Sequence, residues 1–390
     1  MAGMRGAAAV VGIADLHYKR GSGPSESRMV LEAVLAACAD AGVSPREIDG
    51  FTSFAGGDLS GPVLGAELGI DELRHSSMVW GGGGGGAAAA VVNAAAAIAS
   101  GQAEVVVAFR SMAEQQTGRL GYAKYYYDNH YLSAGVGAPA QVCALRTQRL
   151  LEEDGVPAGA MRALAMANYH HAQQDPSAMG FGRPLDVETY ESSRLIVEPF
   201  HVFDCSREND GAVALVLVSA ERARTLAERP AYVIAGAQGA PGGYASLSEN
   251  DDPYGTAGFG PGPRGRGVAR RLWNAAGLTA EDVDVVQVYE NFSGPAVASL
   301  IDHGFAPPGP AAGEVLFFEN LIVGGSLPVN TNGGNIAGSF VNGMGLAVEA
   351  VRQIRGESPN PVPEAKTSLF IGGPMAPLVS SVLFGDADVL

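Results

Sequence analysis

Six consecutive glycines, Gly81 to Gly86, mark the part of this sequence best suited to do chemistry. They lie between a short apolar run that ends at Trp80 and an alanine-rich stretch, Ala87 to Ala99, which we expect to form a buried helix. Glycine lets a backbone turn tightly or approach a ligand closely, and the free N–H groups at a helix start favour negative charge. The junction is therefore a candidate cradle for an oxyanion or a phosphate. A flexible linker is the alternative, although a linker is seldom flanked on both sides by dense apolar sequence.

Several other kinds of site are excluded by the residue types. Cys38, Cys143 and Cys205 are scattered without CxxC spacing, which argues against a disulfide framework and against a zinc site. The glycine run lacks a following Lys-Ser/Thr pair and an acidic residue at dinucleotide spacing, so no nucleotide fingerprint is present. We therefore expect neither a metal nor a nucleotide cofactor.

Composition limits the class of protein. The chain has 390 residues, of which 47% are hydrophobic and 17% charged, so it can bury a large core in one or two closely packed domains. The net charge is −16 with no basic run, which makes nucleic acid and anionic membranes poor partners. The first ten residues lack the apolar core of a signal peptide, and Ala87 to Ala99 is too short to span a bilayer. These features predict a cytoplasmic protein.

A weak internal duplication predicts the architecture. Residues 40–49 (DAGVSPREID) align with residues 275–284 (AAGLTAEDVD), and in both copies a helix ends at a glycine before a short capped turn. An apolar strand follows each turn, at Gly50 to Phe54 and at Val285 to Tyr289. Because strands and helices alternate in both copies, we expect an α/β fold made of two similar halves with mostly parallel sheets.

The middle of the chain breaks this rhythm. Residues 111–204 are richer in Tyr, His, Gln and Arg, and we interpret them as an inserted cap with helices at Gln141 to Asp154 and Ala158 to Gln174. An aromatic loop that includes His130 is a candidate roof for a pocket, or simple loop packing. The predicted domains are residues 1–110 with 205–225, the cap at 111–204, and a second half at 226–390. Gln238 to Arg266 is expected to be a long surface loop.

Several segments together resemble the thiolase superfamily, and the resemblance spans nearly the whole chain. They are residues 99–108, the Asp204-Cys205 pair with residues 210–212, and residues 329–335 (VNTNGGN). Gly343-Met344 followed by residues 349–356 is similar to the C-terminal signature of the thiolase-like lipid-transfer group, which is related to sterol carrier protein x thiolases and includes aldolases of steroid side-chain degradation. The resemblance implies five αβαβα layers and a homodimer.

The residues that carry thiolase chemistry are absent from the matching positions. The nucleophilic cysteine of thiolases falls at Gly84, the second cysteine near Phe370 and the activating histidine at Phe340. The position of the family's third motif is Tyr289. The resemblance therefore implies that covalent Claisen chemistry is ruled out, and none of the three cysteines restores it by position.

What remains is a site for non-covalent chemistry on an acyl-CoA. The expected oxyanion donors are backbone N–H groups near Gly84, Gly85 and Gly373. Tyr289 matches a tyrosine that the resemblance assigns to proton transfer in the aldolases, whereas the second tyrosine of that group is Phe340 here and a nearby histidine is Asn342.

To act as a base, Tyr289 requires a neighbouring group that favours its phenolate, because an unperturbed tyrosine has a pKa near ~10 and is almost fully protonated at neutral pH. Glu290 and Asn342 are further catalytic candidates, Phe340 and His130 are expected to contact substrate, and Arg119, His130 or His201 are candidate cations. Packing of Tyr289 on Phe292, and a salt bridge or cap for Glu290, are the structural alternatives.

Two functions follow as hypotheses. In the first, the protein is a carbon-carbon lyase that cleaves a branched β-hydroxyacyl-CoA of the steroid side-chain type by a retro-aldol reaction, together with a small OB-fold partner that the resemblance implies. In the second, it is a catalytically degenerate subunit that binds acyl-CoA or lipid, or scaffolds such a partner. Acyl transfer is a weaker third alternative because the cysteine is missing. Coenzyme A is expected only as part of the substrate.

Overall fold

A nine-stranded mixed sheet organises the molecule, with strand order β3-β2-β4-β7-β1-β8-β11-β10-β9. The computed structural model describes residues 4–54, 59–80, 83–113, 132–240, 267–373 and 378–390. The strands of this sheet are β1 Ala8–Lys19, β2 Gly50–Phe54, β3 His75–Val79, β4 Val105–Met112, β7 Asn209–Ser219, β8 Ala231–Gly239, β9 Val285–Val288, β10 Thr367–Gly372 and β11 Val379–Gly385. The helices are α1 Glu26–Ala41, α2 Gly61–Leu68, α3 Ala87–Ala99, α6 Pro139–Glu152, α7 Gly159–Ala172, α8 Val187–Glu191, α9 Ala220–Leu226, α10 Val268–Ala276, α11 Ser293–Asp302, α12 Phe318–Leu321 and α13 Met344–Arg355.

The sheet consists of two half-sheets that repeat one topology. The first half has the order β3-β2-β4-β7-β1 and the second, read from its outer edge, β9-β10-β11-β8. They are joined where β1 meets β8, through the pairs Ala9↔Tyr232 and Val10↔Ala231. Beside β9, Val329 makes a parallel bridge to Val286, where the first half has the parallel strand β3 beside β2. The two similar halves expected from the sequence are therefore present. The expectation of mostly parallel sheets is wrong, because only the pairs β2–β3, β2–β4 and β9–β10 are parallel and the other five pairings between described strands of this sheet are antiparallel.

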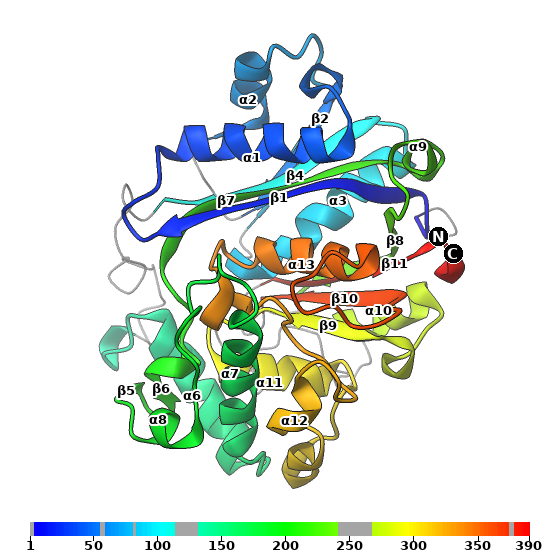
Figure 1. Ribbon diagram of the computed structural model, residues 1–390. Coiled ribbons are helices and arrows are strands. Elements are labelled where there is room, and N and C mark those ends of the chain that lie inside the picture. The colour runs from blue at the N-terminus through cyan, green and yellow to red at the C-terminus, as the bar shows by residue number, and fades with distance from the viewer. Residues whose placement is uncertain (1–3, 55–58, 81–82, 114–131, 241–266, 374–377) are drawn as a thin grey trace.

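Helices fill the space between and outside the half-sheets, which gives the expected five layers (Figure 1). α3 and α13 form the middle layer and contact strands of both halves. α1 covers the outer face of the first half along β1 and β7, and α10 covers the second half along β8 and β11. Because α3 is made almost entirely of alanine and valine, it can pack closely against both half-sheets; ten of its thirteen residues are buried.

Both copies end their outer helix in the same way. α1 is followed by Gly42 with φ +64° and α10 by Gly277 with φ +64°, the left-handed conformation that glycine adopts without strain. The predicted capped turns follow: Glu47 accepts a hydrogen bond from the Ser44 N–H at 2.9 Å, and Asp282 accepts one from the Thr279 N–H at 2.8 Å. The local duplication is thus confirmed in backbone detail.

The predicted cap, residues 111–204, starts too early, because β4 of the nine-stranded sheet continues to Met112. Residues 132–204 contribute no strand to that sheet. They contain α6, α7 and α8 and a small hairpin of β5 Leu195–Val197 and β6 Phe200–His201. These elements lie beside α11 and α12 below the second half-sheet in Figure 1. Within the described ranges, no helix has the length and apolar character needed to cross a bilayer.

One predicted helix is wrong at its start. The sequence predicts a helix that follows the segment Asn332-Gly333-Gly334-Asn335 and ends at Arg355, but residues 334–338 form a single wide turn, η7 Gly334–Gly338, and α13 begins only at Met344. Asn342 and Gly343 between them have φ values of +51° and +86°. Two successive left-handed residues redirect the chain, so the loop 339–343 lies at the start of α13 instead of within it.

Candidate active site

The glycine run lies where the two halves of the protein contact each other. After β3, residues Gly83–Gly86 form the 3₁₀ turn η2, which continues directly into α3. The N–H of Ala89 in the first turn of α3 donates to Ser380 Oγ at 3.0 Å, and Ser380 Oγ donates to the Gly85 carbonyl oxygen. Ser380 lies on β11, so a strand of the second half holds the start of the first-half helix.

Gly85 and Gly373 meet through their backbones. A Cβ atom added to Gly373 would lie 1.9 Å from the Gly85 nitrogen, and one added to Gly85 would lie 1.7 Å from the Leu378 carbonyl oxygen. Gly373 also has φ +53°, which favours glycine. The structure therefore brings together the two segments that were expected to supply oxyanion donors, and neither position has room for a side chain.

Tyr289 follows β9 and lies between two glycine backbones. Its N–H donates to the Ile371 carbonyl oxygen at 2.8 Å, which fixes the main chain. A Cβ on Gly84 would lie 2.2 Å from Tyr289 Cζ, and a Cβ on Gly343 would lie 2.3 Å from Cδ2. The ring is held in a slot that only glycine leaves open.

The phenol of Tyr289 faces the loop before α13. Its hydroxyl donates to Asn342 Oδ1 at 3.3 Å, and its ring centroid lies 6.3 Å from that of Phe340. Phe292 does not pack on Tyr289 as the structural alternative supposed; it stacks on Phe200 with centroids 5.0 Å apart. Tyr289, Phe340, Asn342 and Gly84, chosen from the sequence, thus lie together.

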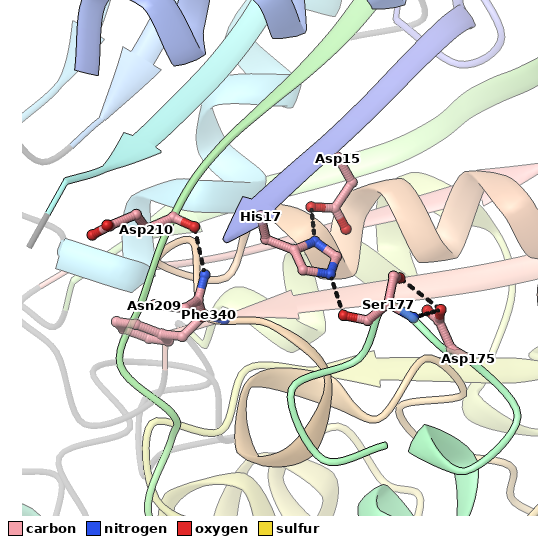
Figure 2. A network of polar contacts seen from close by, with 7 residues as sticks. All are labelled: Asp15, His17, Asp175, Ser177, Asn209, Asp210 and Phe340. Atoms are coloured by element: carbon pink, nitrogen blue, oxygen red, sulfur yellow. Dashed lines mark hydrogen bonds and ion pairs between the residues drawn. The ribbon is translucent and has the colours of Figure 1, made fainter. Parts of the chain in front are cut away.

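Asn209 holds this loop from β7. Its Oδ1 accepts the Phe340 N–H at 2.6 Å, and its own amide donates to the Asp210 carbonyl oxygen at 3.0 Å (Figure 2). Asn209 is completely buried, so the bond is protected from water. The position of Phe340 is therefore set by a residue of the first half.

Glu290 is completely buried and turned toward amide donors. Its Oε1 accepts from Asn168 Nδ2 at 2.8 Å and from the Asn335 N–H at 2.6 Å, and its Oε2 accepts from Asn335 Nδ2 at 2.9 Å. Burial raises the pKa of Glu290 to about 8, against the opposing effect of these hydrogen bonds. Since both oxygens are engaged with cap helix α7 and turn η7, the geometry favours a structural role over the predicted catalytic one.

A second polar network ties β1 to the cap segment beside η7 (Figure 2). His17 Nδ1 lies 3.3 Å from Asp15 Oδ1, and Nε2 lies 2.8 Å from the Ser177 carbonyl oxygen. Burial lowers the pKa of His17, but Asp15, the Ser177 carbonyl and Asp175 outweigh burial and raise it to about 9. The same segment continues to Met179 and Gly180, whose N–H groups donate to η7 carbonyl oxygens at 2.8 and 2.7 Å.

Other predicted residues lie elsewhere. His130 and Arg119 fall outside the described residues, so their place beside a substrate stays a prediction. His201 Nδ1 lies 2.9 Å from the Ser193 carbonyl oxygen, within the cap. Burial raises the pKa of Cys143 and of Cys205 to about 12, which disfavours the nucleophilic thiolate.

Arg110 was not selected from the sequence, although it lies beside the site. It is on β4, and its guanidinium carbon lies 5.4 Å from the centre of the Phe54 ring. Burial lowers the pKa of Arg110, while the charges of Glu26 and Tyr289 act in the opposite direction. The available signal was a single charged residue in a strand, VVVAFRSM, that is apolar except for Arg110 and Ser111.

Comparison with known proteins identifies the family. A family model described as thiolase C-terminal domain-like matches residues 265–383. The chain is 36% identical over 391 residues to the 17-hydroxy-3-oxo-4-pregnene-20-carboxyl-CoA lyase of Mycobacterium tuberculosis, which covers 97% of this chain and 100% of the relative. It is also 36% identical over 396 residues to a steroid side-chain-cleaving aldolase of Thermomonospora curvata, covering 99% of this chain and 100% of that protein. This chain belongs to the thiolase-like aldolases.

Solved structures agree with this membership. A structure described as Ltp2-ChsH2(DUF35) aldolase superposes with a TM-score of 0.89 and 34% sequence identity, over 98% of this chain and 99% of that chain. Solved thiolases at lower identity show the fold alone. The predicted thiolase-like fold is therefore confirmed. At Gly84, the position to which the resemblance assigns the thiolase nucleophile, the structure has a glycine backbone packed against the Tyr289 ring.

Proposed function

We propose that this thiolase-like aldolase is a carbon-carbon lyase that cleaves a branched β-hydroxyacyl-CoA by a retro-aldol reaction without a covalent intermediate. The observation that carries the proposal is the phenol of Tyr289, held against Gly84 at the position where thiolases have their nucleophile. A phenol there can move a proton but cannot easily form the acyl-enzyme that a thiolase needs. Membership of the family supports the same reaction class.

The reaction balances without an outside reagent. Tyr289, as phenolate, takes the proton of the β-hydroxyl, the Cβ–O bond becomes a carbonyl, and the Cα–Cβ bond breaks. The electron pair of that bond passes to Cα and the thioester oxygen as an enolate. The protonated Tyr289 then returns the proton to Cα, which releases a shorter acyl-CoA beside the new ketone. Since no electrons are gained or lost overall, we propose that no cofactor is required and that coenzyme A belongs to the substrate.

The neighbouring groups have complementary tasks in this scheme. The Asn342 amide can accept a hydrogen bond from the phenol through Oδ1 and, after rotation by half a turn, donate to the phenolate through Nδ2. Backbone N–H groups near Gly84 and Gly373 are proposed to stabilise the enolate oxygen, as an oxyanion hole does. Phe340 is proposed to contact the apolar part of the substrate next to Tyr289, from which its ring centroid is 6.3 Å distant.

The substrate class follows from the relatives' names. The name of the Mycobacterium tuberculosis relative describes a 17-hydroxyl group and a thioester carried on carbon 20, which places the hydroxyl on the carbon β to the thioester. Retro-aldol cleavage of such a molecule breaks the bond between carbons 17 and 20 and leaves a 17-ketosteroid. We propose that this chain takes a CoA thioester of the same class.

Turnover of 17-hydroxy-3-oxo-4-pregnene-20-carboxyl-CoA, followed by release of the shorter acyl-CoA and the 17-ketone, tests the proposal. We expect the wild type to cleave it and Tyr289→Phe to lose at least ~10²-fold in kcat, the usual effect of removing a general base. Tyr232→Phe is the matched control, because Tyr232 is a buried strand tyrosine on β8 whose exposed fraction is only 1%. Equal activity of wild type and Tyr289→Phe would overturn the assignment of the base.

A partner protein is part of the proposal. The related solved structure is described as a complex of Ltp2 with ChsH2(DUF35), and we propose that this chain also works with a small OB-fold partner. The turnover assay is therefore run with and without a DUF35 protein co-expressed with the chain. Activity that appears only when the DUF35 protein is present would support the proposal that the chain requires a partner.

The chain is also proposed to form a homodimer through β3. β9, at the far edge of the sheet, is covered by the segment around Val329, whereas β3 is the terminal strand on the other side. No described strand pairs with the outer edge of β3, and such an edge is a template for pairing with another chain. Met78 on β3 and the adjacent Trp80 are exposed by 46% and 88%, large values for apolar side chains.

A binding or scaffolding subunit is the alternative function. The observation in its favour is Phe340, which places a ring without a hydroxyl beside Tyr289, so that Tyr289 is the only phenol that the described residues bring to the site. Tight binding of the steroid CoA thioester without cleavage, both with and without the partner, would support this alternative and exclude the lyase.

A further inference from the structure

Arg110 points toward the candidate active site from the middle of the sheet. Side chains alternate along a strand, so Arg110 shares a face of β4 with Val106, Ala108 and Met112. These three residues belong to the inner core cluster that also contains Tyr289 and Phe340. The Cα partner of Arg110 on β7 is Val213, a member of the same cluster. A cationic side chain is thus placed in the apolar layer next to the phenol.

Phe54 connects Arg110 to the glycine run. The guanidinium carbon lies 5.4 Å from the centre of the Phe54 ring, a cation–π distance. Phe54 also lies against Gly86, where an added Cβ would lie 2.7 Å from Phe54 Cβ. Two residues earlier, Gly84 lies against the Tyr289 ring. The Phe54 ring and the glycine turn at residues 84–86 therefore lie between the Arg110 guanidinium and the Tyr289 phenol.

We propose that Arg110 is a positioning residue whose positive charge stabilises the phenolate of Tyr289, so that Tyr289 can accept the proton of the substrate hydroxyl. The inference rests on the proposed function, because it names the group that prepares the base of that reaction. Arg110 carries its charge throughout the cycle and transfers no proton, since a guanidinium is not deprotonated in proteins.

Electrostatic coupling between two groups is reciprocal, which gives the proposal its physical basis. The charge of Tyr289 favours the charged form of Arg110 and so opposes the lowering of the Arg110 pKa by burial. The Arg110 charge must favour the phenolate by the same interaction. Surrounding protein with a low effective dielectric constant strengthens this attraction compared with water.

Glu26 is a second group among the described residues whose charge acts on Arg110. It begins α1 and accepts a hydrogen bond from the Ser111 hydroxyl at 2.6 Å, so its carboxylate is fixed one residue beyond Arg110 on β4. Around Tyr289 itself the described neighbours are Asn342 before α13, the Gly84 turn and the Phe340 ring, none of which carries a charge. Arg110 is therefore the cation to test.

Titration of Tyr289 by ultraviolet difference absorbance tests the coupling without any turnover. The difference between each protein and its Tyr289→Phe counterpart isolates the tyrosinate signal of this residue. We expect Arg110→Gln to raise the titration midpoint by about one to two pH units, as loss of a neighbouring opposite charge does, and Arg110→Lys to leave it near wild type. Identical midpoints in the wild type, Arg110→Gln and Arg110→Lys would overturn the proposal. Arg146→Gln, which removes another buried arginine in α6, is the matched control and should not move the midpoint.

The pH profile of cleavage links the coupling to catalysis. With the same steroid CoA thioester, Arg110→Gln should lose about 10- to 100-fold in kcat/KM at neutral pH and recover as pH rises, because each unit of midpoint shift is a factor of ten in phenolate. A loss of equal size at every pH would show a merely structural role and overturn the proposal. If the wild type fails to turn over, the proposed function fails, and the absorbance titration still decides whether Arg110 acts on Tyr289.

Discussion

At the scale of single residues, the geometry of the site depends on glycines, whose lack of a side chain leaves room for neighbouring groups. The Tyr289 ring occupies the volume that a Cβ on Gly84 or on Gly343 would need, and Gly373 leaves the corresponding space for the Gly85 backbone. Protein interiors are packed so tightly that even one methyl group in such a place must displace its neighbours. The orientation of the phenol therefore depends on glycines from both halves of the protein, Gly84 in the first and Gly343 in the second.

Gly84→Ala is expected to move the phenol and reduce activity. The new Cβ would lie 2.2 Å from Tyr289 Cζ, so the ring must shift by about 1 Å, a misplacement that can cost ~10²-fold in rate. Overpacking should also lower stability by about 1–3 kcal/mol. Steady-state kinetics and thermal unfolding measure the two effects.

Gly65→Ala provides the comparison for Gly84→Ala. Gly65 is buried in α2, and a Cβ there would lie 4.0 Å from Ile70 Cβ, an ordinary contact. Its activity should equal that of the wild type. Unchanged kcat in Gly84→Ala would mean that the ring is not confined as described.

Most residues of the site were chosen from the sequence, and Arg110 was missed for a physical reason. Tyr289, Phe340, Asn342, Gly84 and Gly373 stand at positions where the resemblance to a family concentrates chemistry. Arg110 lies within a strand, and a sequence does not show which of two faces a strand turns toward a site. The amide partners of Glu290 were equally invisible, since Asn168 is 122 residues away along the chain.

At the scale of elements, the end of β1 is tied to the cap by His17. Its ring nitrogens both face acceptors, one a carboxylate and one a carbonyl, and only the doubly protonated ring can donate to both (Figure 2). Asp15 is charged in the same pair: burial raises its pKa, but His17 and Arg352 outweigh burial and lower it. The Asp15–His17 ion pair on β1 therefore holds the charged ring in place, and the ring donates a hydrogen bond to the carbonyl oxygen of Ser177 in the cap segment.

His17→Gln should destabilise the protein in a pH-dependent way. The folded-state pKa of His17 is raised from 6.5 to about 9, so its stabilisation is fully present below pH 6.5 and is lost as pH rises through 9. We expect His17→Gln to lower the free energy of unfolding by up to ~3 kcal/mol near pH 6, and we expect this difference to disappear above about pH 9. Urea unfolding of both proteins across this range measures it.

His75→Gln serves as the control for the His17 variant. The His75 ring lies on β3, 3.2 Å from the Ser77 hydroxyl, without a carboxylate in that contact. A destabilisation by His17→Gln that is the same at every pH would contradict the ion pair, because packing loss alone does not depend on protonation.

Elements set by local patterns were predicted well, and those set by distant bonds were not. The helix at Ala87–Ala99 and the strand at Gly50–Phe54 have the bounds read from the sequence. The helix expected between Asn335 and Arg355 is interrupted because Asn209 accepts the N–H of Phe340, which is thereby lost to a regular helix. The left-handed φ values of Asn342 and Gly343 then redirect the chain before α13.

At the scale of the whole molecule, the two ends of the sheet differ. β9 is flanked by the segment at Val329, while β3 presents its outer edge beside Met78 and Trp80. Proteins usually protect such an edge with charges, prolines or a covering element. The exposed apolar side chains on β3 are the reason why we propose that a second copy covers it.

Met78→Asp is expected to weaken the homodimer. A carboxylate on the strand edge would have to be buried at an interface without a partner, which costs several kcal/mol and can shift the population to monomer. Analytical ultracentrifugation over a range of concentrations measures the dissociation constant. Leu35→Asp on α1 is the matched control, because Leu35 and Met78 are both 46% exposed. Equal dissociation of both variants, or a monomeric wild type, would contradict an interface at β3.

The duplication was the strongest architectural signal in the sequence, since the two matching segments of ten residues predicted halves that the strand order reproduces. The joint between them was not predictable. It consists of two residue pairs between β1 and β8 and of glycine contacts that depend on three-dimensional approach.

That joint has a consequence for the order in which the protein becomes active. Ser380 bonds to Gly85 across 295 positions of the chain, and Tyr289 enters its slot only when the glycine turn of the other half is already there. Contacts between such distant segments form late, after local helices and hairpins, because closing a long loop carries a large entropic penalty. During refolding, recovery of catalysis should therefore lag behind recovery of helical circular dichroism. The reaction centre exists only after the halves dock, because Gly84 and Gly85 come from one half and Tyr289 and Gly373 from the other.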